Sequence, residues 1–181
     1  MRKIISKWIL RLWGFKIKGE YPHHLKKLVI APAPHTSYWD FPLGILVRTA
    51  IGARMNFVAK KSIFKPPFGW FFRWLGGRPV DRSKSTNYVD SVIEIFKKVD
   101  YFALVIAPEG TRKKVERLKT GFYYIALGAQ VPIVLVRFDF KNKEVVFSDP
   151  FYPTGNKEED FKFIRSYFRG VQGKHADKSL D

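Results

Sequence analysis

Short apolar segments alternate with helical segments along most of this sequence, and the alternation limits what the chain can fold into. Apolar runs that end at proline, glycine or charged residues predict buried strands. These runs cover residues 27–31, 56–59, 77–80, 101–107, 131–138 and 144–147. Helical patterns cover residues 40–50, 86–99, 120–129 and 156–169. Alternating strands and helices predict an α/β fold, with a largely parallel central sheet flanked by helices.

The length of the chain bounds the number of domains. A chain of 181 residues suits one domain with a sizeable core and is too short for two ordinary domains. No internal repeat or low-complexity linker divides it. We therefore expect an amphipathic helix within residues 1–18, a single α/β domain over residues 19–170 and a flexible polar tail over residues 171–181.

The composition excludes several classes of protein. Apolar residues make up 46% of the chain and aromatic residues 17%, which excludes a disordered chain. Without cysteine, the chain has no disulfide, cysteine-ligated metal or thiol nucleophile. No uncharged apolar run approaches the roughly 18–20 residues that span a bilayer, and the N-terminus lacks the pattern of a signal peptide. We expect no metal site and no bound cofactor.

The strong positive charge of the chain points to an anionic partner. The chain has 33 lysines and arginines against 16 acidic residues, which gives a net charge of +17. Such a balance favours nucleic acid, phospholipid headgroups or a phosphorylated substrate. The sequence contains no recognisable nucleic-acid-binding motif. We therefore expect no nucleic acid partner, and a nucleic-acid-binding module stays as an alternative hypothesis.

The N-terminal helix combines an apolar face with charged side chains that are all positive. Residues 1–18 carry six basic side chains and no acidic one. A helix with tryptophan on its apolar face and basic side chains beside it suits the plane of an anionic membrane surface. The alternative is an ordinary amphipathic helix that packs on the domain. The membrane interpretation assigns this role to Ile4, Ile5, Lys7, Trp8, Arg11, Leu12 and Trp13.

A second aromatic cluster occupies residues 64–75, Phe64-Lys-Pro-Pro-Phe-Gly-Trp-Phe-Phe-Arg-Trp-Leu75. So many aromatic side chains in so short a segment cannot all point the same way. Some of them should face lipid, a partner or an acyl chain. Simple core packing around the Pro66-Pro67 turn is an equal alternative.

His35 is the histidine placed best for chemistry. It follows a predicted strand and a proline-rich turn, and Asp40 stands five residues later at the start of the next helix. A neutral imidazole is a natural general base, and a carboxylate on its other nitrogen fixes the tautomer and stabilises the imidazolium. A local hydrogen bond without catalysis is the alternative. Because no serine has the context of a nucleophile elbow, His35 would activate a hydroxyl group of the substrate.

Basic side chains follow several of the predicted strands. Lys60 and Arg82 each stand at a strand end, and the segment Ala107-Pro-Glu-Gly-Thr-Arg112 follows the most apolar strand. A glycine turn lets backbone amides approach an anion, and an arginine binds phosphate through two hydrogen bonds. The carboxyl ends of parallel strands meet at one edge of a sheet, where α/β proteins bind ligands. We therefore expect one basic pocket that also contains His35.

Four segments in this order resemble the glycerolipid acyltransferase family, which includes the 1-acylglycerol-3-phosphate acyltransferases. The first is His35 followed by Asp40 after four intervening residues. The other three are Gly77-Arg-Pro-Val-Asp-Arg82, Glu109-Gly-Thr-Arg112 and Val131-Pro-Ile-Val-Leu-Val136. The resemblance covers about the middle two thirds of the chain.

The resemblance implies a reaction and roles for these residues. His35 is the general base, oriented by Asp40, and it deprotonates the hydroxyl of a lyso-lipid that attacks an acyl thioester. Positions matching Lys60, Arg82, Glu109, Gly110, Thr111 and Arg112 surround the phosphate of the acceptor in the family. The co-substrate is acyl-CoA or acyl carrier protein, and the enzyme is expected as a peripheral, monotopic protein on the cytoplasmic face of an anionic membrane, where it serves phospholipid biosynthesis.

One departure from the family pattern leaves the acceptor open. Ala107 stands where an aromatic residue often precedes the Pro-Glu-Gly-Thr-Arg segment of the family. The acceptor is then either a lysophospholipid such as 1-acylglycerol-3-phosphate or a different lyso-lipid, for example a lyso-amino-acid lipid. A noncatalytic membrane-binding protein that keeps the fold is a further alternative.

Overall fold

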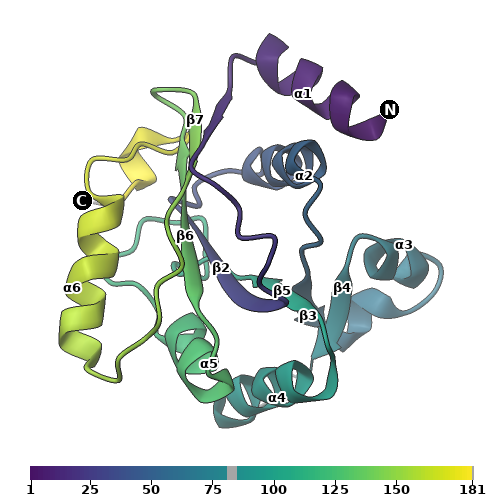
Figure 1. Ribbon diagram of the computed structural model, residues 1–181, viewed down its shortest axis with the longest axis vertical. Coiled ribbons are helices and arrows are strands. Elements are labelled where there is room, and N and C mark those ends of the chain that lie inside the picture. Colours follow the sequence, from purple (N-terminus) through teal and green to yellow (C-terminus); the bar gives the residue numbers. More distant parts are fainter. Residues whose placement is uncertain (81–84, 181) are drawn as a thin grey trace.

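A central sheet of five strands forms the middle layer of the protein (Figure 1). The structure, a computed structural model, describes residues 1–80 and 85–180. The strands are β1 (Lys16–Lys18), β2 (Lys27–Ala33), β5 (Phe102–Val105), β6 (Ile133–Asp139) and β7 (Glu144–Phe147), in the order β1-β7-β6-β2-β5. Neighbouring strands are parallel except β6 and β7. The predicted α/β fold with a largely parallel sheet is confirmed.

Helices cover both faces of this sheet (Figure 1). One face carries α1 (Arg2–Leu12) and α2 (Asp40–Ile51), and the other carries α4 (Ser85–Lys98), α5 (Gly121–Ala129) and α6 (Lys157–Phe168). Alternate side chains of β2 pack against the two layers of helices, because successive residues of a strand point to opposite faces of the sheet. Val29 lies in the core under α4, α5 and α6, whereas Leu28 lies in the core under α1 and α2.

A second, smaller sheet lies beside β5. It consists of β3 (Phe57–Lys60) and β4 (Gly77–Val80), which pair in parallel, and a bridge between Asn56 and Leu104 joins it to the edge of the central sheet. Between these strands the aromatic segment forms a short 3-10 helix (Lys61–Phe64) and the helix α3 (Gly69–Trp74). The aromatic pattern alone did not predict these two helices.

Two boundaries differ from the sequence-based expectation. The first helix ends at Leu12, and residues 16–18 form β1 in the central sheet rather than part of a membrane helix. Strand β2 runs past Pro32, although proline cannot donate a ladder hydrogen bond. Ile30 accepts its bond from Ile106 on the β5 side. Because strand residues alternate, Pro32 also turns its nitrogen to that side, beyond the last residue of β5, so no ladder bond is lost.

The structure corrects the expectation of a flexible C-terminal tail, because residues 171–180 pack against the domain. Val171 and Ser179 are buried, and a 3-10 helix spans Ala176–Lys178. The backbone N–H of Phe140 donates to Gln172 O at 2.8 Å, and that of Gly173 donates to Ser179 Oγ at 2.9 Å. The polar composition of this segment suggested fraying, but its backbone groups find partners in the fold.

The middle of the sheet should carry a large part of the stability. Leu135 lies on β6 and is fully buried, so Leu135→Ala should lower the free energy of unfolding by about 2–5 kcal/mol through lost burial and a residual cavity. Urea denaturation measures the loss. Leu12→Ala is the matched control, because Leu12 is 84% exposed. Equal losses in the two variants would contradict the placement of the core.

Candidate active site

His35 and Asp40 meet where β2 ends and α2 begins. The imidazole Nδ1 lies 2.8 Å from Asp40 Oδ2, and the same carboxylate oxygen accepts a hydrogen bond of 2.9 Å from the backbone N–H of Ser37. Asp40 is the first residue of α2 and is buried. The positive end of a helix dipole favours a carboxylate there. The predicted pair is therefore brought into direct contact.

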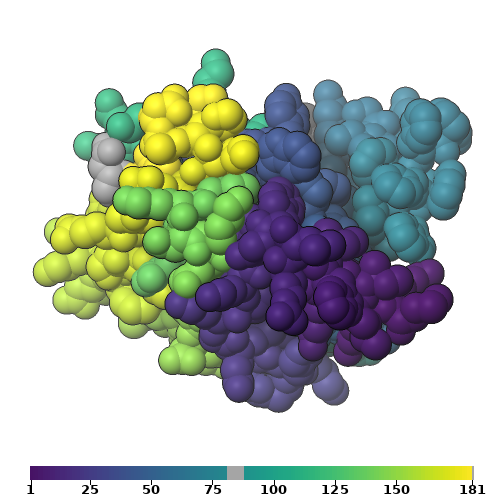
Figure 2. All heavy atoms as spheres, turned by 90° about the horizontal axis from the view of Figure 1, so that it is seen from above, coloured from purple at the N-terminus to yellow at the C-terminus, as the bar shows by residue number. Residues whose placement is uncertain are grey.

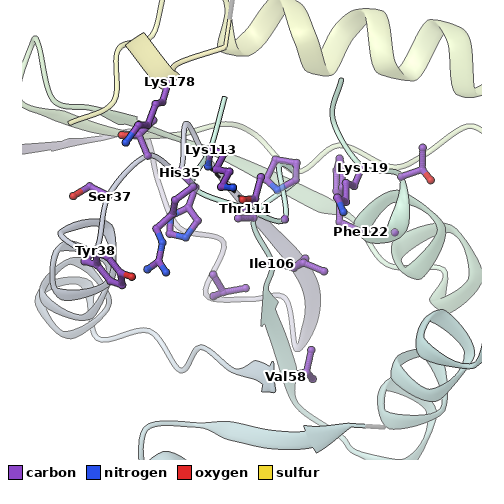
Figure 3. Close-up of a pocket in the computed structure, with 18 of the residues that line it drawn as sticks. His35, Ser37, Tyr38, Val58, Ile106, Thr111, Lys113, Lys119, Phe122 and Lys178 are labelled. Atoms are coloured by element: carbon purple, nitrogen blue, oxygen red, sulfur yellow. Dashed lines mark hydrogen bonds between the residues drawn. The ribbon is translucent and has the colours of Figure 1, made fainter. Parts of the chain in front are cut away.

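This contact determines which nitrogen of His35 is available for chemistry. A carboxylate only accepts hydrogen bonds, so the neutral ring donates its Nδ1–H to Asp40 and carries its lone pair on Nε2. The side chain of His35 is 30% exposed and lines a cavity of about 1270 Å³ (Figure 3), whereas that of Asp40 is 2% exposed. The pair thus presents one basic nitrogen to the cavity and keeps its carboxylate away from water.

Glu109 does not line the cavity but contacts the backbone of His35. Its Oε2 accepts a hydrogen bond of 2.6 Å from the backbone N–H of His35, and the residue is 1% exposed. Burial raises the pKa of Glu109 from 4.5 to about 7, although the bond from His35 and the nearby imidazole oppose this shift. The loop after β5 is thereby tied to the residue that carries the imidazole.

The turn after Glu109 brings an arginine to the cavity. Gly110 has a φ of 63°, a left-handed conformation that glycine adopts without strain. Gly110, Thr111 and Arg112 line the cavity, and the guanidinium carbon of Arg112 lies 3.6 Å from the ring centroid of Tyr38. Such a cation–π contact positions the guanidinium while leaving its hydrogen-bond donors free for an anion.

The cavity has a basic region and an apolar region. In Figure 3, Lys113 and Lys178 lie toward the end that contains His35, and Val58 and Ile106 lie toward the other end. Val89 and Phe122 add further apolar lining. No acidic side chain is among the described lining residues. A cavity of this kind suits an amphiphile with an anionic group and a hydrocarbon chain.

The structure does not bring every predicted residue to this cavity. Lys60 ends β3 and is exposed, outside the residues that line the cavity. Val58 of the same strand lines the cavity but Lys60 at its end does not, so the expected convergence fails for Lys60. Arg82 lies outside the described residues.

Several lining residues were missed by sequence reasoning. They are Tyr38, Lys113, Lys119, His175 and Lys178. Tyr38 and Lys113 stand beside segments already singled out, so proximity to those segments was the available signal. His175 and Lys178 come from the C-terminal segment, and nothing in its composition indicated that it returns to the sheet edge. Within residues 1–80 and 85–180, no three His, Cys, Asp or Glu side chains gather as metal ligands.

The two apolar surfaces predicted from the sequence are partly packed and partly exposed. On α1, Leu10 is buried against the domain, while the exposed large apolar side chains are Ile4, Ile5, Trp8, Ile9 and Leu12. Trp13 is half-buried and contacts Trp39 with ring centroids 5.6 Å apart. In the second cluster Phe64 is buried, and Phe68, Phe71, Trp70 and Trp74 are exposed. Among the described residues, no helix is long and apolar enough to cross a bilayer.

The match to a family model identifies the class of protein. The model, described as Acyltransferase, covers residues 15–139, more than half of the chain. The chain therefore belongs to the acyltransferase family, and the resemblance inferred from the four segments is confirmed. The matched range includes His35, Asp40 and the Glu109–Arg112 turn.

Curated relatives carry the name 1-acyl-sn-glycerol-3-phosphate acyltransferase. The protein from Streptococcus pneumoniae is 32% identical over 138 residues, which cover 72% of this chain and 50% of the relative. The protein from Saccharomyces cerevisiae is 35% identical over 131 residues, 67% of this chain and 41% of the relative. The chain spans half or less of the length of these two relatives.

A solved structure has the same fold. The crystal structure of the 1-acyl-sn-glycerophosphate acyltransferase PlsC from Thermotoga maritima is similar with a TM-score of 0.62 and 22% sequence identity. The similarity covers 91% of this chain and 74% of that one. At this identity the comparison supports the α/β fold.

The buried carboxyl group of Glu109 should make stability depend on pH. Its pKa is raised in the folded protein, so the folded state holds its proton more tightly than the unfolded state does. The associated stability is present below pH 4.5 and is lost as the pH rises to about 7 and above. Relative to Glu109→Gln, the wild type should lose on the order of 3 kcal/mol across this window.

Urea denaturation at a series of pH values measures this difference. Glu116→Gln is the matched control, because Glu116 is exposed and should leave the wild-type profile unchanged. A difference between wild type and Glu109→Gln that stays constant with pH would contradict the raised pKa.

Proposed function

We propose that this protein is an O-acyltransferase that moves a fatty acyl group from an acyl thioester to the hydroxyl of a lysophospholipid such as 1-acylglycerol-3-phosphate. One observation carries this proposal: the His35–Asp40 pair faces a cavity that is basic at one end and apolar at the other. A single pocket thus offers a base for a hydroxyl, cations for a phosphate and an apolar wall for a hydrocarbon chain.

In the proposed reaction His35 works as a general base. Its Nε2 takes the proton of the acceptor hydroxyl while the oxygen attacks the carbonyl carbon of the thioester. The carbon–oxygen bond forms and the carbon–sulfur bond breaks as the tetrahedral intermediate collapses. The leaving thiolate takes the proton from the imidazolium, which gives an ester and a free thiol. Asp40, 2.8 Å from Nδ1, holds the tautomer and stabilises the imidazolium.

The phosphate of the acceptor is proposed to bind near the Gly110–Arg112 turn. Arg112 offers two parallel donors at the cavity, and Tyr38 supports its guanidinium plane. Glu109 is proposed to act indirectly, by holding the backbone of His35. Arg82 keeps the contact with the phosphate that the family resemblance implies for it, as a proposal only, whereas Lys60 lies outside the residues that line the cavity.

The donor is proposed to be acyl-CoA or acyl carrier protein. Both are polyanionic, and the net charge of +17 favours their encounter with this protein. No metal or bound cofactor is needed for this transfer, since the imidazole handles the proton and the thiolate is a good leaving group.

A different lyso-lipid, such as a lyso-amino-acid lipid, is the second candidate acceptor. Ala107 lines the cavity next to the Glu109 turn and leaves room where the family resemblance implies an aromatic side chain. A panel of lyso-lipids offered with both donor types, followed by mass analysis of the products, distinguishes the two acceptors.

The protein is proposed to work as a peripheral protein on the cytoplasmic face of an anionic membrane. The exposed apolar residues of α1 lie beside Lys7 and Arg11, which are also exposed. In both Figure 1 and Figure 2, α1 and the aromatic helix α3 lie toward the same side of the molecule. Aromatic and basic side chains together suit the headgroup layer of an anionic bilayer.

Replacing the imidazole tests the proposed reaction. His35→Ala should keep the fold and lower acyl transfer by about 100-fold or more, as expected for the loss of a general base. Transfer of a radiolabelled acyl group from acyl-CoA to 1-acylglycerol-3-phosphate measures the rate. His24→Ala is the matched control, because His24 is exposed and does not line the cavity. Near-wild-type transfer by a folded His35→Ala protein would defeat the proposal.

Acidic substitutions among the exposed apolar residues of α1 test the proposal that this helix binds the membrane. Trp8→Glu combined with Leu12→Glu should weaken binding to vesicles of phosphatidylglycerol and phosphatidylcholine by about tenfold or more, since it removes apolar burial and adds repulsion. Vesicle sedimentation measures binding. Phe163→Glu is the control, because Phe163 is an exposed aromatic residue of α6, on the other side of the sheet from α1. Unchanged vesicle binding by the double variant would contradict the proposal that α1 binds the membrane surface.

A further inference from the structure

The C-terminal segment, residues 171–180, reaches the cavity although it lies beyond the matched family range. The family model ends at residue 139, yet His175 and Lys178 line the same cavity as His35. Figure 3 shows Lys178 toward the end of the cavity that holds His35 and Ser37, whereas Lys119 lies farther along. This part of the chain therefore adds side chains to a site that the matched region does not complete alone.

The segment is attached directly beside the catalytic pair. The backbone N–H of His175 donates to Thr36 Oγ1 at 3.1 Å, and Thr36 is 2% exposed. Gly173 packs so closely on Thr36 that an added Cβ would lie 2.5 Å from Oγ1. Ser179 Oγ accepts a bond of 2.9 Å from the N–H of Gly173 and closes the loop on itself. These contacts hold Lys178 at a defined place.

The charged side chains among the described residues that line the cavity are all basic. Arg112, Lys113 and Lys178 line the cavity from two separate parts of the chain, and the described lining residues include no carboxylate. Three cations with no acidic side chain among them repel one another unless an anion binds. A phosphate group offers several strong acceptor oxygens to such a cluster.

We propose that residues 171–180 complete the active site and that Lys178 binds a phosphate group of a substrate next to His35. This inference rests on the proposed acyl transfer. The phosphate belongs to the acceptor lipid or to the thioester donor, since both carry one. Lys178 is a substrate-binding residue in either case and takes no part in proton transfer.

Loss of the ammonium should weaken substrate binding more than turnover. Lys178→Gln removes a charge-assisted contact made in the ground state, so KM should rise about tenfold or more with little change in kcat. Lys178→Arg should restore most of the affinity because it keeps the positive charge. Lys174→Gln is the matched control, since Lys174 is an exposed lysine of the same segment that does not line the cavity.

Steady-state kinetics with each substrate varied in turn identifies which phosphate is bound. A rise in KM for 1-acylglycerol-3-phosphate alone assigns Lys178 to the acceptor, and a rise for acyl-CoA alone assigns it to the donor. Gly173→Ala, which pushes the segment from Thr36, should raise the same KM. Values for Lys178→Gln equal to those for Lys174→Gln, with both substrates, would overturn the inference.

Binding of inorganic phosphate separates this inference from the proposed function. Calorimetric titration of the full chain with phosphate needs no acyl transfer, and Lys178→Gln should weaken the binding by about tenfold relative to Lys174→Gln. If the wild type transfers no acyl group but shows this difference, the proposed reaction fails and the phosphate site stands. Equal phosphate binding by the two variants, with transfer intact in the wild type, would overturn the phosphate site alone.

Discussion

The hydrogen bond between His35 and Asp40 is the contact on which the functional site depends. It joins the end of β2 to the first residue of α2, so one bond of 2.8 Å links the imidazole to a buried carboxylate at a helix start. A second bond, from the backbone of His35 to Glu109, adds the loop after β5. Neighbouring parallel strands thus deliver an imidazole and a turn with an arginine to one cavity, as expected at the carboxyl edge of such a sheet.

The two layers of helices give the sheet two separate cores, and the cavity opens between the loop that follows β2 and the helices α4 and α5. The loop between β2 and α2 supplies His35 and Ser37 at the polar end, while Val89 of α4 and Phe122 of α5 supply apolar lining. The same fold appears in the Thermotoga maritima structure. The sheet holds the short loop of His35 between β2 and α2, and other loops add the cations around it.

Periodicity predicted most of the fold because the strands of the central sheet are buried on both faces and read as continuous apolar runs. It failed where burial is partial. Strand β1 alternates lysine and isoleucine at the sheet edge, and four of the six residues of α3 are aromatic, so α3 shows no clear apolar periodicity. The His35–Asp40 pair was predictable because its residues lie close in sequence. Lys60 was misplaced because sequence spacing does not show which residues of a strand reach the cavity. Lys178 was missed because its position depends on a contact of its segment with Thr36, which is distant along the chain.

Helix α1 packs on α2 through Leu10, and Trp13 touches Trp39, the residue just before Asp40. If a membrane-binding helix were joined to the domain by a flexible linker, the distance between the cavity and the bilayer would vary. Here the helix proposed to rest in the lipid is held against the helix that begins with Asp40, so the fold itself sets the distance of His35 from that helix. The depth at which a lipid hydroxyl sits, rather than the reach of a linker, then decides which molecules arrive within range of the imidazole.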